Sequence, residues 1–410
     1  MDSFVLQVGR LIDGLGNPVQ RNMAVVVEQG LIKQVMPQAR LAPPDAAEVL
    51  SYRKATLLPG LIDCHTHTNM PGNGRTGEQV IGDGDDLRLL RSARNAATAL
   101  RTGVTTLCDN GAWNHSGFAL KQGVSSGEVV GSRVLACGRP VTITGGHLWY
   151  MGGEADGADG VQHTVRELVK DGADFIKVAA TGGSTVTSNP YQPAFSVKEL
   201  AAIADEGHRY GKPVGAHCRC VQGMSRVLEA GHDIIYHAFF DGPDRQPSFD
   251  AKVAKRIAQQ GVWVNPTLHI SRSGAWALEK KEKTAGLTSE EKTMLEQRRH
   301  SHQTRIDHCR RMLDAGVKII AGSDCGWGHY PFGQFTHELE CMTLAGMTPL
   351  QAITSATGDA ARALGIDCTV GSLAPGKSAD LLVVDGDPSS NVLDLMKVKA
   401  VFKSGIKVAG

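Results

Sequence analysis

A repeated order of helix, glycine and strand runs through the middle of this chain and limits the folds that it can adopt. Helical stretches end in a glycine turn and are followed at once by a short β-branched run, as in LRTGVTT, VKDGADFIKV, HRYGKPVGAH, LEAGHDIIYH and LDAGVKIIAGSD. Glycine relieves the left-handed conformation at the end of a helix before the next strand begins. This alternation favours βα units and a parallel sheet.

Eight short runs fit the strands of such a sheet, and eight is the number that closes a barrel. The runs cover residues 56–62, 104–109, 133–137, 174–178, 213–217, 233–237, 262–266 and 317–323. We therefore predict an α/β fold in which residues 56–367 form a (β/α)8 TIM barrel.

The two ends of the chain alternate apolar with polar residues between glycine turns. FVLQVGRLI and MAVVVEQGLIKQVM lie near the start, and SADLLVVDGDP and VKAVFKSGIKV lie near the end. Each end alone is too short to bury one face of a sheet. We therefore expect residues 1–55 and 368–410 to form one small β-sandwich domain together.

The segment from about residue 271 to residue 305 is longer and more charged than the other connections that follow a strand. Its EKKEKTAGLTSEEKTMLEQRRH stretch is typical of an exposed helix. Because it follows the seventh predicted strand on the face where barrel active sites lie, two interpretations are open. It either covers the substrate or is a solvated insertion without a catalytic role.

Charge and composition exclude some classes of function. Lys plus Arg (43) nearly balances Asp plus Glu (42), so no net field attracts nucleic acid or an anionic membrane. No apolar run reaches the roughly eighteen residues of a membrane span, and the amino terminus lacks the features of a secretory signal. The nine scattered cysteines, without a C-x-x-C pair, suit a reducing compartment. We expect a cytoplasmic protein.

Metal-binding side chains occur at the carboxyl ends of several predicted strands. His65 and His67 form an H-x-H at the first strand, where an extended chain turns both imidazoles to one side. His217, His237 and Asp324 follow the fifth, sixth and eighth strands. Because the carboxyl ends of parallel strands meet at one mouth of a barrel, we expect these side chains to converge there. Imidazole nitrogens suit a zinc-like ion.

Lys177 lies in the apolar strand segment FIKV, where a buried ammonium group needs a partner. Two interpretations are open. Lys177 pairs with a carboxylate at the rim such as Asp324, or it reacts with CO2 and becomes a carbamate. A carbamate is an anion whose two oxygens can bridge two cations.

Five motifs in a fixed order carry a resemblance to a known family. PGLIDCHTH, FIKV, GAHC, YHAF and GSD resemble the amidohydrolase superfamily in its binuclear form with a carboxylated lysine. GMTPLQAITSATGDAARALG and VGSLAPGKSADLLVVDGDP are similar to the carboxy-terminal part of its prolidase-like and imidazolonepropionase-like members. The motifs extend from Leu58 to Pro388, over nearly the whole chain.

The resemblance implies two divalent metal ions, zinc or else manganese or cobalt. It implies that His65, His67 and Asp324 hold the first ion and that His217 and His237 hold the second. A carboxylated Lys177 then bridges both ions. A hydroxide shared between ions roughly 3.5–4 Å apart is then the nucleophile. Asp324 is the catalytic residue that takes the proton and passes it to the leaving amine.

Two further residues are candidate substrate contacts. His147, in ITGGHLWY, resembles the Gly-Gly-His loop of the prolidase-like branch, and Tyr236 directly precedes a metal histidine. Both could bind the α-carboxylate of a peptide. The alternatives are a surface histidine and an inward-facing core tyrosine.

The motifs also bear on the reaction. No carboxylate follows His217 within several residues, which argues against deamination, and Lys177 argues against an imidazolonepropionase. The resemblance implies a prolidase-like Xaa-dipeptidase or N-acyl amino acid hydrolase that acts on a small molecule and forms a homo-oligomer. Hydrolysis of a xenobiotic amide, carbamate, urea or lactone is the alternative, and a non-catalytic metal-binding barrel is the alternative of another class.

Overall fold

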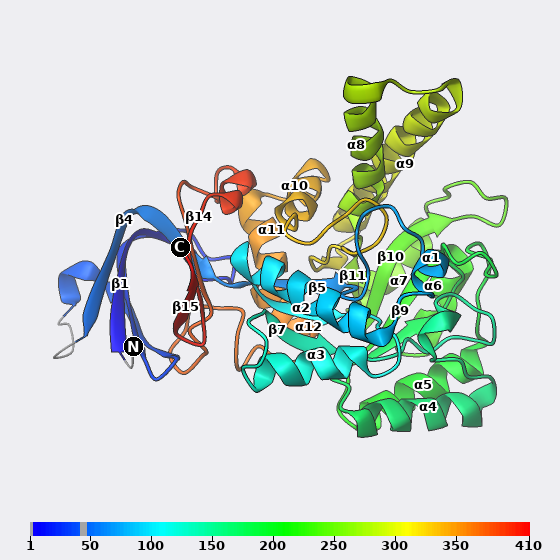
Figure 1. Cartoon of the computed structure of the whole chain (residues 1–410), viewed down its shortest axis with the longest axis horizontal. Coiled ribbons are helices and arrows are strands. Elements are labelled where there is room, and N and C mark those ends of the chain that lie inside the picture. Colours follow the sequence, from blue (N-terminus) through cyan, green and yellow to red (C-terminus); the bar gives the residue numbers. More distant parts are fainter. Residues whose placement is uncertain (1–2, 42–46) are drawn as a thin grey trace.

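The computed structural model describes residues 3–41 and 47–410, and its strands fall into two groups (Figure 1). One group is made from both ends of the chain. Its strands are β1 (Ser3–Leu11), β2 (Gln20–Glu28), β3 (Leu31–Pro37), β4 (Glu48–Pro59), β13 (Leu381–Val384), β14 (Val398–Lys403) and β15 (Ile406–Ala409).

These strands form one seven-stranded sheet in the order β15-β14-β13-β4-β1-β2-β3. Antiparallel pairing of β13 with β4 joins the two ends of the chain, with Leu381 opposite Pro59. The sheet encloses an apolar cluster in which the rings of Phe4 and Phe402 stack 5.2 Å apart. All seven strands thus belong to one hydrogen-bonded sheet, whereas the sequence predicts the two facing sheets of a sandwich.

The second group contains parallel strands that run through the centre of the molecule (Figure 1). These are β5 (Leu61–Thr66), β6 (Val104–Asp109), β7 (Arg133–Ala136), β8 (Ile176–Ala179), β9 (Val214–Cys220), β10 (Ile234–Asp241), β11 (Trp263–Asn265) and β12 (Lys318–Ile319). They form a three-stranded sheet, β5-β6-β7, and a five-stranded sheet, β12-β11-β10-β9-β8.

Isolated parallel bridges connect these two sheets at both junctions, between Val141 and Val178 and between Thr66 and Cys325. The ladder of hydrogen bonds is therefore interrupted twice. The α/β class is as predicted, but the described strands do not make the single closed ladder that the sequence predicts.

The predicted first strand, residues 56–62, is wrong in its first half. Thr56 to Pro59 belong to β4 in the sheet of the chain ends, and β5 begins only at Leu61. The chain crosses from one sheet to the other at Gly60, where a Cβ would lie 2.1 Å from the Thr105 hydroxyl oxygen. The pattern of apolar residues in the sequence could not show this break, because the residues before and after Gly60 are both extended and apolar.

Helices flank the parallel strands (Figure 1). They are α1 (Gly77–Val80), α2 (Asp85–Arg101), α3 (Ser116–Ser125), α4 (Gly157–Asp171), α5 (Val197–Arg209), α6 (Val221–Glu229), α7 (Ala251–Gln260), α8 (Leu268–Ala285), α9 (Ser289–Asp314), α10 (Thr336–Leu344), α11 (Pro349–Ser355) and α12 (Gly358–Ala363). Short 3-10 helices lie at Gln38–Arg40, Trp149–Met151 and Val392–Met396. Among the described residues, no helix has both the length and the apolar character that crossing a bilayer requires.

The glycines of the repeated pattern take the conformation that the sequence analysis assigns to them. Their φ angles are all positive: 92° at Gly103, 102° at Gly172, 65° at Gly211, 79° at Gly231 and 81° at Gly316. A side chain in this left-handed region would be strained. The glycines therefore end the helices and let the next strand begin.

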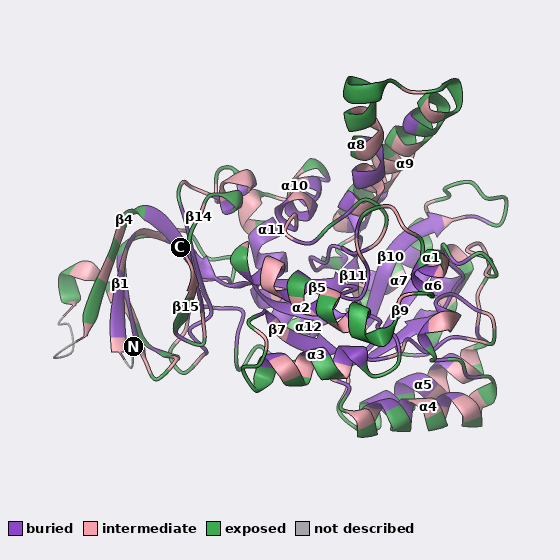
Figure 2. Cartoon of the chain, in the orientation of Figure 1, coloured by how far each residue is buried: buried purple, intermediate pink, exposed green. Residues whose placement is uncertain are grey.

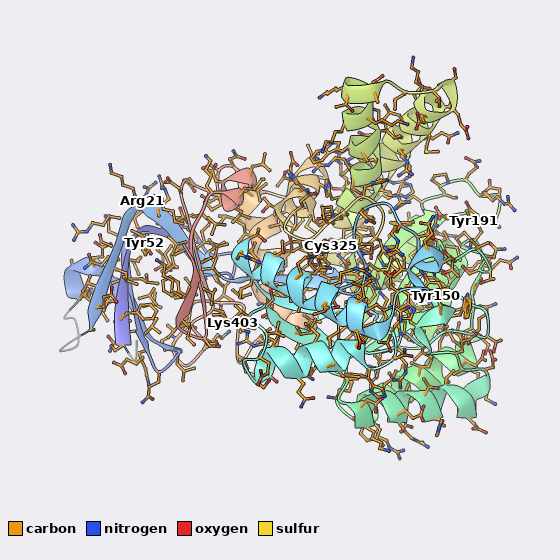
Figure 3. All side chains as sticks on the ribbon, viewed as in Figure 1. Arg21, Tyr52, Tyr150, Tyr191, Cys325 and Lys403 are labelled. Atoms are coloured by element: carbon orange, nitrogen blue, oxygen red, sulfur yellow. The ribbon has the colours of Figure 1, made fainter. Side chains whose placement is uncertain are left out.

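The charged segment of residues 271–305 lies within the paired helices α8 and α9, which project from the body of the molecule (Figure 1). Thr288 and Glu291 form a capping box that starts α9. The outer ends of both helices are exposed, and the ends next to the parallel strands are more buried (Figure 2). Elsewhere, the Lys403 ammonium (Figure 3) donates to the Gly131 carbonyl oxygen at 2.7 Å and ties β14 to the segment before β7.

Candidate metal centre and substrate cavity

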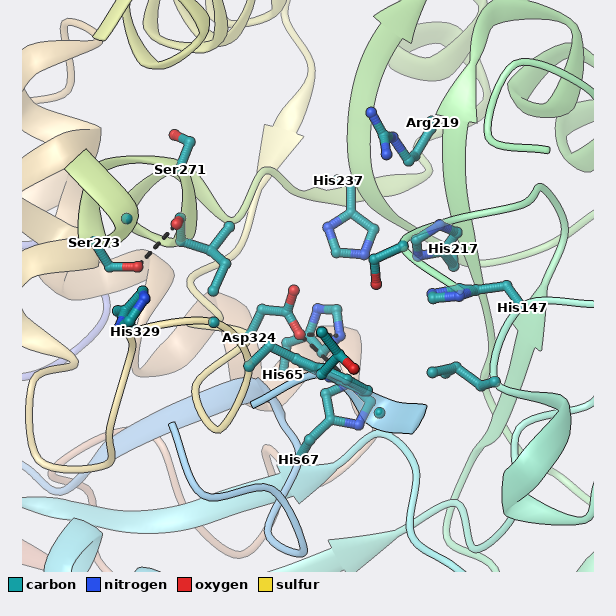
Figure 4. Close-up of a pocket in the computed structure, with 18 of the residues that line it drawn as sticks. His65, His67, His147, His217, Arg219, His237, Ser271, Ser273, Asp324 and His329 are labelled. Carbon is teal, nitrogen blue, oxygen red and sulfur yellow. Dashed lines mark hydrogen bonds and ion pairs between the residues drawn. The ribbon is translucent and has the colours of Figure 1, made fainter. Parts of the chain in front are cut away.

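A cavity of about 450 Å³ lies at the carboxyl ends of the parallel strands (Figure 4). All six predicted metal-binding residues line it: His65, His67, Lys177, His217, His237 and Asp324. Of the two predicted substrate contacts, His147 is among the lining residues and Tyr236 is not. The cavity therefore brings together side chains from distant segments, as expected for the mouth of a barrel.

His65, His67 and Asp324 form the first part of the site. One carboxylate oxygen of Asp324 lies 3.5 Å from Nε2 of His65 and 3.4 Å from Nε2 of His67. One ligand atom from each residue lies within 4.8 Å of the others, so the three side chains could hold a metal ion.

Hydrogen bonds fix which nitrogen of these two imidazoles is free. Asn265 donates to the carbonyl oxygens of Ile320 and Gly322, so its own amide oxygen accepts from Nδ1 of His65 at 3.0 Å. Nδ1 of His67 donates to the Gly111 carbonyl oxygen at 3.1 Å. In both rings Nε2 therefore keeps its lone pair, which is the form that binds a metal.

His217 and His237, from neighbouring strands, form the second part of the site, with ring centroids 4.4 Å apart. Nε2 of His217 donates to the Gly182 carbonyl oxygen at 3.2 Å, which leaves Nδ1 free. The Thr267 hydroxyl lies 2.8 Å from Nδ1 of His237, which leaves Nε2 free. The His237 ring is 5.1 Å from the His65 ring, so the two parts adjoin.

Burial lowers the pKa of all four histidines, His65, His67, His217 and His237, well below the usual value, and neighbouring positive groups add to this effect. The imidazoles are therefore neutral at physiological pH. Neutral imidazole is the ligand that divalent transition metals require. The donor set thus fits divalent cations of the zinc type.

Lys177, on β8, is buried and lines the same cavity as the four histidines. Its ammonium nitrogen lies 3.1 Å from Nε2 of His65 and 3.8 Å from the centroid of the Tyr236 ring. Burial lowers the pKa of Lys177, while the Asp324 carboxylate opposes that change. Burial in turn raises the pKa of Asp324, which the charge of Lys177 opposes.

Tyr236 lies under Lys177 with its hydroxyl pointing away from the cavity. The hydroxyl donates to the side-chain oxygen of Asn110 at 3.1 Å. Its ring occupies the space next to Gly215, where a Cβ would lie 2.5 Å from the ring. Tyr236 is therefore a floor of the site. His147 lines the cavity, with its ring centroid 4.5 Å from that of His217.

Strained backbone occurs at the turns that aim these side chains. His237, Thr267 and Asp324 have φ of 74°, 49° and 60°, in the left-handed region that non-glycine residues rarely adopt. Such residues cost of order 1–3 kcal/mol each and persist where the surroundings fix them. Two of these strained residues, His237 and Asp324, are predicted ligands, and the third, Thr267, contacts His237 through its hydroxyl.

The rim of the cavity is held by ion pairs and helix contacts. Asp83 accepts hydrogen bonds from Arg75 at 3.0 Å and from Arg91 at 2.6 Å, and these bonds lower the pKa of Asp83 to about 2. This network holds the cavity-lining residues before α1. On the opposite side, both carboxylate oxygens of Glu338 accept from the first backbone N–H groups of α8, at 2.8 and 2.6 Å.

A comparison with family models decides which family this site belongs to. The model of the amidohydrolase family matches residues 56–408. The chain belongs to the amidohydrolase family. The family that the motifs predict is thereby confirmed, and the chain is a hydrolase of a family that acts on amide and peptide bonds.

Known members of this amidohydrolase family resemble the chain along its whole length. Ochratoxinase of Aspergillus niger is 26% identical, over 97% of this chain and 84% of that protein. A Xaa-Pro dipeptidase, solved with methionine bound in its active site, is 27% identical with a TM-score of 0.85, over 99% of both chains. A prolidase, solved with N-methylphosphonate-L-proline, is 26% identical with a TM-score of 0.83, over 99% of both chains.

Sequence reasoning missed the residues that orient the histidines. Asn265 ends β11 and Thr267 precedes α8, and neither belongs to a motif. It also missed the position of Tyr236, although Gly215 inside a strand is a signal that another group approaches closely. The arginines Arg298 and Arg305 line the cavity, but their helix has the pattern of an exposed one.

Proposed function

We propose that this amidohydrolase cleaves the amide bond of a dipeptide or an N-acyl amino acid at a binuclear metal centre. The observation that carries the proposal is the position of Lys177, whose nitrogen lies 3.1 Å from Nε2 of His65 in a cavity that the other three predicted histidine ligands also line. The likeness to a Xaa-Pro dipeptidase and a prolidase over 99% of each chain supports the choice of substrate.

The proposed roles follow the geometry. His65, His67 and Asp324 would hold the first ion, and His217 and His237 would hold the second. Lys177, as a carbamate, would be a ligand shared by both ions. Divalent ions bound there supply Lewis acidity, which makes water nucleophilic near neutral pH and polarises the scissile carbonyl.

Asp324 is the proposed catalytic residue. Its carboxylate faces the cavity and lies next to both ligands of the first ion. It accepts the proton of the attacking water and returns it to the leaving amine nitrogen. His147 faces the same space and is proposed to bind the carboxylate of the carboxy-terminal residue, above the floor that Tyr236 provides.

We also propose how the family's architecture applies to this chain. The two parallel sheets act together as a (β/α)8 barrel over residues 56–367, which the isolated bridges at both junctions support. Residues 1–55 and 368–410 act as a second domain with the role of the family's β-sandwich, which the pairing of β4 with β13 supports.

Metal analysis and one variant test the centre. We expect about two zinc, manganese or cobalt ions per chain after purification from metal-supplemented medium, and fewer than one ion would contradict a binuclear site. Lys177→Ala should lose activity and regain part of it when acetate or propionate is added. Lys121→Ala is the control, because Lys121 pairs with Asp174 at the surface. An unchanged rate in Lys177→Ala would remove the bridging role.

A second candidate substrate is a xenobiotic amide with an aromatic group. Phe239 and Trp327 line the cavity and offer apolar faces to such a group, and one relative is named ochratoxinase. Rates for a dipeptide library, N-acyl amino acids, aromatic amides, phenylureas and lactones would separate the candidates. A kcat/KM at least tenfold higher for aromatic amides than for every dipeptide would favour the second.

A further inference from the structure

Two arginines of the α8–α9 pair line the cavity. Arg298 and Arg305 lie seven residues apart on α9, so they occupy the same face of the helix. They approach the metal-binding residues from the projecting helices and not from a strand end. This segment therefore contributes charge to the site.

Neither arginine has an acidic partner in the described structure. Within residues 3–41 and 47–410, no carboxylate oxygen lies within 4.0 Å of the guanidinium of Arg298 or Arg305. Nearby arginines are paired, since Arg299 lies 2.7 Å from Glu279 and Arg219 lies 2.9 Å from Asp241. Among the described residues, neither guanidinium thus makes a direct ion pair, and the carboxylates of Asp241 and Asp324 act on Arg305 only from a greater distance.

Contacts hold Arg305 beside the proposed ligands. Its guanidinium carbon lies 3.4 Å from the centroid of the Phe239 ring. The charge of Arg305 lowers the pKa of His237, and the charge of Asp324 raises the pKa of Arg305, so the guanidinium is close to both parts of the site. Burial and the charge of Arg219 lower the pKa of Arg305 to about 9, which leaves it protonated at neutral pH.

A glycine inside α8 makes room for Arg298. A Cβ at Gly274 would lie 1.7 Å from a terminal nitrogen of the Arg298 guanidinium. Glycine in the interior of a helix costs about 1 kcal/mol relative to alanine. The position of Arg298 against bare helix backbone explains why glycine occurs there.

We propose that Arg298 and Arg305 form an anion-binding subsite that holds a carboxylate of the substrate, away from the scissile bond. The planar guanidinium matches a carboxylate with two parallel hydrogen bonds. The subsite selects substrates with a free carboxylate over their neutral amides. The identity of the substrate as an N-acyl amino acid or dipeptide rests on the proposed function, whereas binding of the carboxylate does not.

Calorimetric binding to the metal-loaded protein tests the subsite with four related probes. N-acetyl-L-glutamate has two carboxylates, N-acetyl-L-glutamine has only the α-carboxylate, N-acetyl-L-glutamate α-amide has only the side-chain carboxylate, and N-acetyl-L-glutamine amide has none. We expect Arg305→Gln and Arg298→Gln to weaken binding of at least one singly charged probe tenfold or more, and to leave the neutral probe within twofold. The probe that loses affinity identifies which carboxylate is held.

Controls separate the subsite from a general effect on folding. Arg299→Gln, on the same helix but paired with Glu279, should change no affinity, and Arg305→Lys should fall between wild type and Arg305→Gln. Equal loss for charged and neutral probes, or no binding of any charged probe to wild type, would overturn the subsite. Turnover is measured separately, so that probes which bind through these arginines but are not hydrolysed contradict the proposed function alone.

Discussion

Replacing Asn265 by leucine should weaken the first metal site through a residue that touches no metal. Asn265 is fully buried and makes three hydrogen bonds, to His65 at 3.0 Å and to the carbonyl oxygens of Ile320 and Gly322 at 3.3 and 2.9 Å. Leucine has nearly the same shape but leaves one ring N–H and two carbonyls without this partner. Unpaired buried polar groups cost about 1–3 kcal/mol each, and partial relaxation makes a total loss of about 3 kcal/mol reasonable.

The effect on metal binding is separate from the effect on folding. Without the bond to Nδ1, the His65 ring is free to change tautomer and orientation, and loss of such a contact lowers metal affinity about 10- to 100-fold. Chelator competition measures the affinity, and urea unfolding in the presence of EDTA measures the apo stability. Ser132→Ala is the control, since this buried hydroxyl donates to the Val104 carbonyl oxygen at 2.6 Å outside the cavity lining. If Asn265→Leu is destabilised but binds the first ion within threefold of wild type, the orienting role is refuted.

Three further predictions concern the rim and the projecting helices. Because the folded pKa of Asp83 is about 2 against an ordinary 3.8, its stabilisation is complete above pH 4 and is lost as the pH falls through 2. Solvent screens these ion pairs at the rim, so Asp83→Asn should remove about 1 kcal/mol at neutral pH and flatten acid unfolding in that window. An unaltered acid transition would contradict this. Glu338→Ala leaves two N–H groups of α8 unpaired, so amide exchange at the start of α8 should accelerate about tenfold or more while the far end of α9 keeps its rate. Gly274→Ala should keep or raise the melting temperature but displace Arg298, so binding of N-acetyl-L-glutamate should weaken; unchanged affinity would show that the position of Arg298 is unimportant.

The parts of the fold and site that the sequence predicts are those with a local signature. Glycines such as Gly172 and Gly261 end helices because their φ is positive, and a short strand follows each of them. His65 and His67 are recognisable because two imidazoles two residues apart on a strand face the same side. These features depend only on neighbours in the chain.

The remaining features depend on residues that meet only after folding. Asn265 is an ordinary strand residue until the Ile320 carbonyl fixes its amide and so selects the nitrogen that His65 offers. The left-handed backbone of His237 has no sequence signal, since histidine does not require it. Arg305 lies in a strongly charged helix, where its neighbours indicate solvent. Only the folded structure shows that the Arg305 guanidinium lies against the Phe239 ring and not in an ion pair with a carboxylate.

The pairing of β4 with β13 has a consequence for the order in which the protein forms. Leu57 lies opposite Val383, so a contact between the first and last parts of the chain completes the sheet of the ends. During synthesis, all of the proposed metal-binding residues leave the ribosome before β13 does, while β4 still has an open edge. Contacts between residues so far apart in the sequence form slowly, because a very long loop must close first. We expect the nascent chain to assemble its parallel strands early and to expose the unpaired edge of β4, which could pair with another chain, until β13 has been synthesised.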